Sequence, residues 1–170
     1  MASGKSTIGP ILANVLGWDY HDLDSEIEDR EENKIVDIFE QKGEEYFRSV
    51  ESRTLKDLAE RNNIVVSLGG GTMAKEENLN LMKTTGKIIF LDTSPEEVYK
   101  RLKHKTDRPL IKDLVISNGS REEFLERINK LLGEREPYYS RADIKINTDD
   151  SNVGKTVDLI KKKISKYIDD

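Results

Sequence analysis

Two short apolar runs constrain the fold of this chain more than any other feature of its sequence. They are residues 64–68 (IVVSL) and residues 87–91 (KIIFL), and each is followed by a turn signal. Runs of this length and composition are typical of strands that are buried on both faces, as in parallel sheets. Longer helical patterns separate them, such as the apolar stripe within residues 44–61. Strands that alternate with helices predict an α/β fold built on a parallel sheet.

Weaker signals complete the expected order of elements. Residues 143–147 form a shorter strand candidate and residues 18–20 a weak one. Ser94 precedes a proline and two acids, and Ser120 opens a capping box, so each marks a helix start. Residues 153–168 carry the apolar face of a closing helix. The segment 105–119 lacks a clear period and lies between two predicted helices, which is typical of a functional lid.

Composition limits the classes of function. A length of 170 residues predicts one domain over residues 1–170. The net charge of −5 argues against general nucleic-acid binding, because phosphate backbones are bound by basic surfaces. The chain contains no cysteine and no apolar run of the roughly 20 residues that a membrane span needs. We therefore expect a cytoplasmic protein with no membrane partner.

The tetrapeptide GKST, Gly4 to Thr7, matches the second half of a phosphate-binding loop. In such a loop the glycine lets the backbone approach phosphate oxygens, the lysine neutralises charge and the hydroxyl holds Mg²⁺. A helix follows to Leu16 and ends at Gly17, although Pro10 could kink it. The first glycine of the pattern would lie upstream of Met1. A simple capped helix start therefore remains an alternative.

Acidic and glycine motifs follow two of the predicted strands. Asp22 and Asp24 come after the weak strand, where they could hold Mg²⁺ through water and receive a hydroxyl proton. An acidic turn that caps the helix 25–30 is the alternative. Gly69, Gly70 and Gly71 follow the strand 64–68 and suggest close approach of a ligand to the backbone. A flexible turn would explain them equally well.

Four arginines are candidate anion ligands: Arg48, Arg101, Arg108 and Arg135. Taken singly, each would be expected to be a solvated charge on the surface. Arg108 differs because it precedes Pro109 inside the predicted lid, where a closing guanidinium can stabilise a transferring phosphoryl group.

Taken together, the motifs resemble those of the shikimate kinase family. Seven occur in the family's order and near its spacings: GKST (4–7), DLD (22–24), FR…E (47, 48 and 51), GGG (69–71), LD (91–92), RPL (108–110) and R-x-P-x-Y (135–139). The resemblance implies a three-layer α/β/α P-loop kinase fold, similar to nucleoside monophosphate kinases, with a parallel five-stranded sheet and a mobile lid.

This chain departs from the family at its start. Family members begin with an apolar strand that runs into G-F-M-G, and this chain starts at the equivalent of that methionine. We therefore expect the central first strand to be missing and Met1 to mark an N-terminal truncation. The neighbours of that strand would be unpaired on both sides. At residues 148–153, where the family often places a basic residue against adenine, this chain has Asp149 and Asp150.

The implied reaction moves the γ-phosphate of ATP onto the 3-hydroxyl of shikimate, with Mg²⁺, in the pathway to chorismate and aromatic amino acids. The implied partners are the small molecules shikimate and ATP, and we expect a monomer. Two alternatives stay open. The chain could be a non-catalytic shikimate-binding fragment with an incomplete nucleotide loop, or a small-molecule kinase similar to gluconate kinase.

The resemblance also assigns roles to residues. Lys5 contacts the β- and γ-phosphates, Ser6 ligates Mg²⁺ with Asp22 assisting through water, and Asp24 is the base that also binds substrate hydroxyls. Lys5, Asp24 and Arg108 form the catalytic set. The nucleotide set is Ser3, Gly4, Lys5, Ser6, Thr7, Arg101, which stacks on adenine, and Arg108. The substrate set is Asp24, Gly69, Gly70, Gly71 and the carboxylate ligands Arg48 and Arg135.

Overall fold

The structure is a computed structural model that describes residues 2–103, 120–149 and 152–168. Within these ranges the strands are β1 (Asp19–Asp22), β2 (Ile64–Ser67), β3 (Ile89–Asp92) and β4 (Ile144–Asn147). The α-helices are α1 (Lys5–Leu16), α2 (Leu23–Glu31), α3 (Ile35–Ala59), α4 (Glu76–Thr85), α5 (Pro95–Leu102), α7 (Arg121–Tyr139) and α8 (Val153–Ile164). Two 3₁₀ turns, η1 (Thr72–Ala74) and η2 (Ser165–Tyr167), complete the order.

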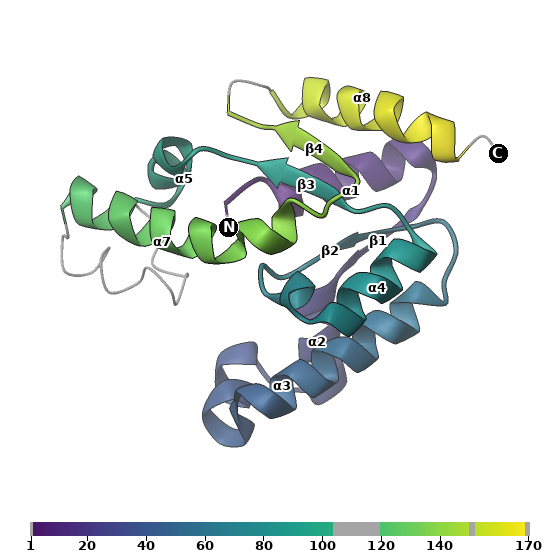
Figure 1. The fold of residues 1–170 in the computed structure, drawn as a ribbon. Coiled ribbons are helices and arrows are strands. Elements are labelled where there is room, and N and C mark those ends of the chain that lie inside the picture. Colours follow the sequence, from purple (N-terminus) through teal and green to yellow (C-terminus); the bar gives the residue numbers. More distant parts are fainter. Residues whose placement is uncertain (1, 104–119, 150–151, 169–170) are drawn as a thin grey trace.

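Helices cover both faces of the strands (Figure 1). Alternate residues of a strand point to opposite faces, and here they enter different cores. Val65 and Ile89 pack against the cluster formed with α1 and α8. Ile64 and Val66 pack against the cluster formed with α2, α3 and α4. The three-layer α/β/α arrangement predicted from the sequence is therefore confirmed.

The strands pair in parallel, but in two separate sheets. β1 pairs with β2 in a register that sets Asp22 opposite Ser67, and β3 pairs with β4 so that Asp92 lies opposite Asn147. Among the described residues no ladder joins β2 to β3. The expectation of two neighbouring strands with unpaired edges matches this arrangement.

Helix boundaries follow the predicted capping signals in most places. The Ser94 hydroxyl accepts from the backbone N–H of Glu97, and Ser120 forms the predicted capping box. Gly17 ends α1 in a left-handed conformation, with φ 70°, and α1 continues through Pro10. Two expectations were too simple. α3 begins earlier than residue 44 because it continues across a kink at Gly43, and the closing helix ends at Ile164 before turn η2.

Asp143 ties the start of β4 to its neighbours. One carboxylate oxygen accepts from the backbone N–H of Ile88 at 2.8 Å, and the other lies 2.9 Å from the Lys83 ammonium. Burial alone would raise the pKa of Asp143, but the Ile88 N–H and Lys83 hold that pKa below its ordinary value of 3.8. The ionised carboxylate therefore stabilises the folded state.

We predict that Asp143→Asn lowers the free energy of unfolding at pH 7 by about 1 kcal/mol, because the charge-assisted contacts are lost. Asp143 has a lowered pKa in the folded state, so its contribution to stability is complete only well above the ordinary value of 3.8. It is lost as the pH falls through that lowered pKa. Urea unfolding from pH 7 to pH 2 should therefore show a weaker acid dependence in the variant. Asp158→Asn, at an exposed position of α8, is the matched control, and equal acid dependence in both variants would contradict the prediction.

Candidate active site

A cavity of about 860 Å³ lies where β1 and β2 end and α1 begins. Ligand sites of open α/β sheets form at this edge, outside the carboxyl ends of the strands. Most of the residues singled out in the sequence line this cavity: Ser3, Gly4, Lys5, Ser6, Thr7, Asp22, Asp24, Gly69, Gly70, Arg101 and Arg135. Residues far apart in the sequence are thus brought into one space.

The amino end of α1 forms one wall of the cavity. Gly4 is the N-cap with φ 94°, a left-handed conformation that glycine adopts without strain. Its carbonyl accepts from the backbone N–H groups of Thr7 and Ile8, at 3.0 and 2.8 Å. The first N–H groups of a helix point outward and favour an anion, and Lys5 lies beside them. This wall has the chemistry of a phosphate site.

The two aspartates of the DLD motif play different parts. Asp22 ends β1 and caps α2, because its Oδ1 accepts from the N–H groups of Asp24 and Ser25 at 3.1 and 3.4 Å. The capping alternative is therefore correct, and Asp22 nevertheless also lines the cavity. Burial raises the pKa of Asp24, and the nearby charges of Asp22 and Glu51 raise it further, against the opposing effect of Lys5. A carboxyl group with a raised pKa in a cavity is suited to general base chemistry.

The oxygen atoms that line the cavity could supply part of the coordination of a magnesium ion. In the described part of the chain, no group of three His, Cys, Asp or Glu side chains is placed to hold a metal ion. The Ser6 hydroxyl and the Asp22 carboxylate both line the cavity. Mg²⁺ commonly takes one or two protein oxygens, several waters and substrate phosphates. The residues therefore fit an ion that is held jointly with a nucleotide.

The triple glycine makes room for three side chains that were predicted to bind substrate. A Cβ at each position of 69–71 would approach or overlap one of them. None of the three glycines has a positive φ, so a Cβ here would act through space, by shifting the ends of these side chains, and not through backbone conformation. A Cβ added at Gly69 would lie 3.1 Å from Asp24 Oδ1, and one added at Gly71 would lie 2.9 Å from Arg48 Nη2. A Cβ added at Gly70 would overlap Arg135 Nη1.

Glu51 was part of a motif in the sequence, but no role was assigned to it there. Its side chain is 1% exposed, and it accepts from Arg48 Nη1 at 2.9 Å and from the Thr72 hydroxyl at 2.7 Å. A buried acid is costly unless it is paired, so Glu51 holds Arg48 in place. The sequence feature that could have indicated this role is the position of Glu51, an acid on the apolar stripe of α3.

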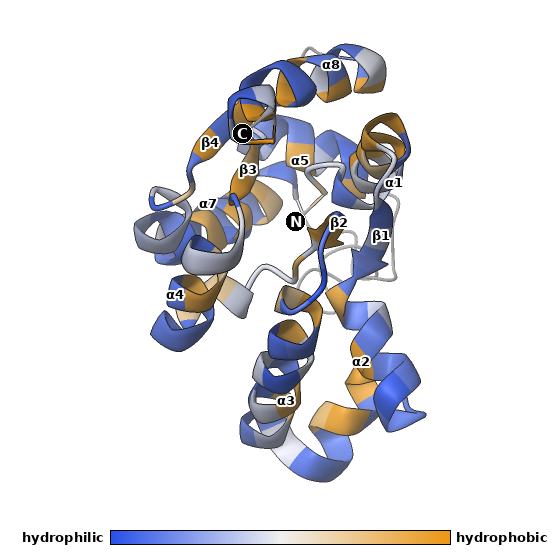
Figure 2. Ribbon diagram, turned by 90° about the vertical axis from the view of Figure 1, so that its right-hand side faces the viewer, coloured by the Kyte–Doolittle hydropathy of each residue, from blue (hydrophilic) through white to orange (hydrophobic). Residues whose placement is uncertain are grey.

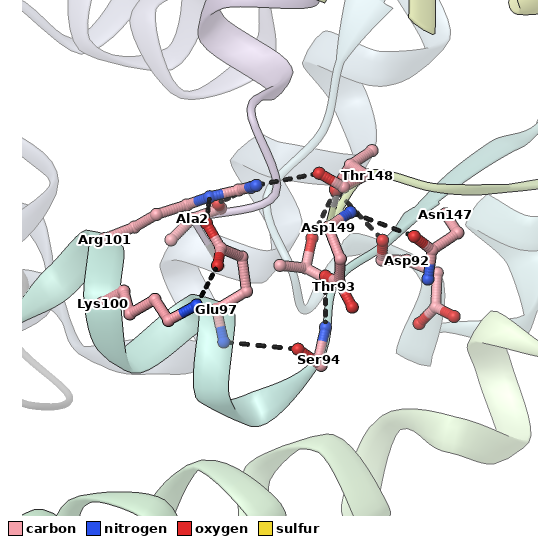
Figure 3. A network of polar contacts seen from close by, with 10 residues as sticks. All are labelled: Ala2, Asp92, Thr93, Ser94, Glu97, Lys100, Arg101, Asn147, Thr148 and Asp149. Carbon is pink, nitrogen blue, oxygen red and sulfur yellow. Dashed lines mark hydrogen bonds and ion pairs between the residues drawn. The ribbon is translucent and has the colours of Figure 1, made fainter. Parts of the chain in front are cut away.

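Arg101 makes contacts that its predicted role did not anticipate (Figure 3). Its guanidinium donates to the carbonyls of Ala2 and Thr148, at 3.0 and 2.9 Å, and its Nε donates to Glu97. It thus ties the start of the chain to the turn after β4. Asp149 accepts from the backbone N–H of Ser94 at 2.9 Å in the same network. Stacking of Arg101 on adenine stays a prediction, and Arg108 and the lid 105–119 lie outside the described residues.

Parallel strands, helices on both faces and a Gly-Lys helix start at the carboxyl edge define a P-loop kinase of small molecules. The family model described as "Shikimate kinase" matches residues 1–165. The shikimate kinase of Chlorobaculum parvum is 45% identical over 166 residues, covering 98% of this chain and 89% of that protein. The chain belongs to the shikimate kinase family.

Solved structures agree with this assignment. The shikimate kinase of Bacteroides thetaiotaomicron superposes with a TM-score of 0.85 at 30% identity, covering 96% of this chain and 93% of that one. The shikimate kinase of Acinetobacter baumannii in complex with shikimate gives a TM-score of 0.83 at 30% identity, with coverage of 98% and 89%. The comparisons favour neither a gluconate-kinase-like enzyme nor a non-catalytic fragment.

The packing at Gly70 predicts a selective defect. In Gly70→Ala the new methyl group would overlap the Arg135 guanidinium and displace it. We expect the KM for shikimate to rise by roughly tenfold or more, since a displaced charged hydrogen bond costs about 1.5–3 kcal/mol. Steady-state kinetics at saturating ATP measures the change.

Gly133→Ala is the matched control for Gly70→Ala. Gly133 lies on α7, the helix that carries Arg135, and a Cβ there would meet no heavy atom within 4 Å. Its KM should be unchanged while its stability rises by about 0.5–1 kcal/mol. A KM in Gly70→Ala equal to that of the control would show that the glycine does not make room for Arg135.

Proposed function

We propose that the protein transfers the γ-phosphate of ATP to the 3-hydroxyl of shikimate, giving ADP and shikimate 3-phosphate. One observation carries the proposal: a single cavity joins a phosphate-binding helix start to a carboxyl group of raised pKa and to Arg135. The similarity to the Acinetobacter enzyme in complex with shikimate supports the same substrate here.

ATP is proposed to bind with its phosphates against the amino end of α1. The N–H groups of residues 3–6 would donate to the phosphate oxygens, and Lys5 would neutralise the β- and γ-phosphate charge. Mg²⁺ would be held by Ser6 directly and by Asp22 through water, and it would neutralise charge on the β- and γ-phosphates. Arg101 would present its planar guanidinium to the adenine ring.

Asp24 is the proposed base. It would accept the proton of the 3-hydroxyl while that oxygen bonds to the γ-phosphorus, as the bond from phosphorus to the bridging oxygen of ADP breaks. Burial and the charges of Asp22 and Glu51 favour the protonated form of Asp24, so proton transfer to it is easier than to a solvated carboxylate. Lys5 opposes this effect and keeps the ionised form accessible.

The substrate carboxylate is proposed to lie between Arg48 and Arg135. A planar guanidinium binds a carboxylate through two parallel hydrogen bonds, which fixes orientation as well as position. The Gly70 N–H would add a further donor. The Tyr139 hydroxyl donates to the Gly70 carbonyl at 3.2 Å, which supports a fixed position for that backbone.

Several wider features belong to the same proposal. We infer one domain over residues 1–170, with residues 105–119 as a lid that brings Arg108 to the phosphates. We also infer a cytoplasmic monomer. In the described part of the chain, no helix is long and apolar enough to cross a membrane.

A coupled assay of ADP release tests the proposed reaction. With MgATP and shikimate we expect turnover, and Asp24→Asn should reduce kcat by about 10²–10⁴-fold, as expected for loss of a general base. A raised folded-state pKa means that the Asp24 contribution to stability is lost as the pH rises. Asp24→Asn should therefore increase the free energy of unfolding at pH 7.

Two controls sharpen this test. Gluconate replaces shikimate in one arm, and Asp158→Asn replaces Asp24→Asn in the other. Turnover of gluconate but not of shikimate would overturn the substrate assignment. Unchanged kcat in Asp24→Asn, with the expected gain in stability, would remove Asp24 from the proton transfer while leaving the reaction itself in place.

The lid arginine has its own test. Arg108→Ala should lower kcat by roughly 10³-fold or more, the effect of losing a guanidinium from a phosphoryl-transfer transition state. The Kd for shikimate, measured by calorimetry, should change much less. Lys103→Ala, an exposed cation at the end of α5, is the control. A kcat for Arg108→Ala equal to that of the control would exclude Arg108 from the mechanism.

A further inference from the structure

The three carbonyl groups of the triple glycine are held by two kinds of donor. The carbonyls of Gly69 and Gly71 accept from backbone N–H groups of turn η1, at 3.3 and 3.0 Å. The Gly70 carbonyl has one hydrogen-bond donor in the described part of the chain, which is the Tyr139 hydroxyl at 3.2 Å. Glycine backbone turns more freely than that of any other residue, so the direction of this carbonyl depends on a side chain.

The fold sets the position of the Tyr139 ring. Tyr139 is the last residue of α7, and its ring stacks on that of Phe90 in β3, with centroids 4.6 Å apart and planes at 23°. α7 lies beside β3 in two perpendicular views (Figures 1 and 2). Stacked aromatic pairs at this separation are stabilising. The hydroxyl therefore reaches Gly70 from a ring that two elements of the fold hold in place.

Arg135 approaches the same glycine from the same helix. It lies four residues before Tyr139 on α7, so the two side chains share one face of that helix. A Cβ added at Gly70 would overlap Arg135 Nη1 and lie 3.2 Å from the Tyr139 hydroxyl oxygen. Gly70 and Arg135 line the cavity of about 860 Å³, whereas Tyr139 is not among the described residues that line it. Tyr139 thus contacts Gly70 from outside the cavity.

The Arg135 guanidinium has no hydrogen bond or ion pair with another residue in the parts of the chain that the structure describes. A guanidinium carries five N–H donors and binds any acceptor within reach. If the Tyr139 hydroxyl were absent, the Gly70 carbonyl would lack its donor, and Arg135 is the other polar group beside that glycine. The carbonyl would then compete with a ligand for the guanidinium.

We propose that Tyr139 is a positioning residue for the substrate carboxylate, because its hydroxyl satisfies the Gly70 carbonyl and so leaves Arg135 available to the ligand. The inference rests on the proposed function, since it takes the ligand of Arg135 to be the carboxylate of shikimate. It adds a residue outside the cavity to those that determine the affinity for shikimate.

The substitution Tyr139→Phe tests this role, because it removes the hydroxyl and keeps the ring that stacks on Phe90. We expect the Kd for shikimate, measured by calorimetry, and its KM to rise by roughly three- to tenfold, as for the loss of one neutral hydrogen bond. The KM for ATP and kcat should stay unchanged, because the hydroxyl donates to Gly70 and not to the start of α1. Equal weakening of both substrates, together with a lower Tm, would show a purely structural role and overturn the proposal.

Tyr138→Phe is the matched control, since it makes the same chemical change at the neighbouring residue. Tyr138 packs against the apolar cluster formed with α2, α3 and α4, and its hydroxyl makes no hydrogen bond to a described residue. Its Kd for shikimate should equal that of the unsubstituted chain. Equal Kd values in Tyr138→Phe and Tyr139→Phe would overturn this inference alone. Absence of shikimate binding by the unsubstituted chain would overturn the proposed function and this inference with it.

A double-mutant cycle tests whether Tyr139 acts through Arg135. The value of kcat/KM for shikimate is measured for Tyr139→Phe, for Arg135→Ala and for the double variant. Residues that act through one another give non-additive effects, so Tyr139→Phe should cause little further loss once Arg135 is removed. The same fold-loss from Tyr139→Phe in both backgrounds would show that the tyrosine does not act through Arg135, contrary to the proposal.

Discussion

The parallel pairing of β1 with β2 decides where the chemistry of this protein can lie. The register that sets Asp22 opposite Ser67 makes both strands end at one level. The second residues beyond the two strands, Asp24 after β1 and Gly69 after β2, therefore meet at the same edge. Packing of α1 against both strands brings the start of that helix to this edge as well. The strand pairing and the packing of α1 thus bring together three motifs that are distant in the sequence.

Sequence patterns predicted the strands, helices and their layers better than they predicted the side-chain contacts between these elements. The β-branched runs of β2 and β3 and the caps at Ser94 and Ser120 depend on local chemistry, so they could be recognised locally. The course of α3 across Gly43 and the pairing of Glu51 with Arg48 depend on tertiary packing. Such contacts leave only a faint trace in the sequence, here one acid on an apolar stripe.

The triple glycine has a property in the structure that its sequence pattern did not reveal. The sequence suggested close approach of a ligand to the backbone at residues 69–71. In the structure the close neighbours of this backbone are Asp24, Arg48 and Arg135 of the protein itself. A Cβ would shift the ends of these side chains, and no local pattern can reveal which side chains they are. Steric space at a site is a property of the fold, while turn propensity is a property of the segment.

The surroundings of Arg48 explain how one arginine can be both fixed and available. Nη1 is held by the buried Glu51, whereas Nε and Nη2 both donate to Glu44, at 3.3 and 3.2 Å. Glu44 is 67% exposed, so this second pair is weak and easily replaced. The edge formed by Nε and Nη2 is one that a planar carboxylate binds through two hydrogen bonds. In the proposed mechanism, shikimate therefore displaces Glu44 while Glu51 keeps the guanidinium oriented, and the binding geometry exists before the substrate arrives.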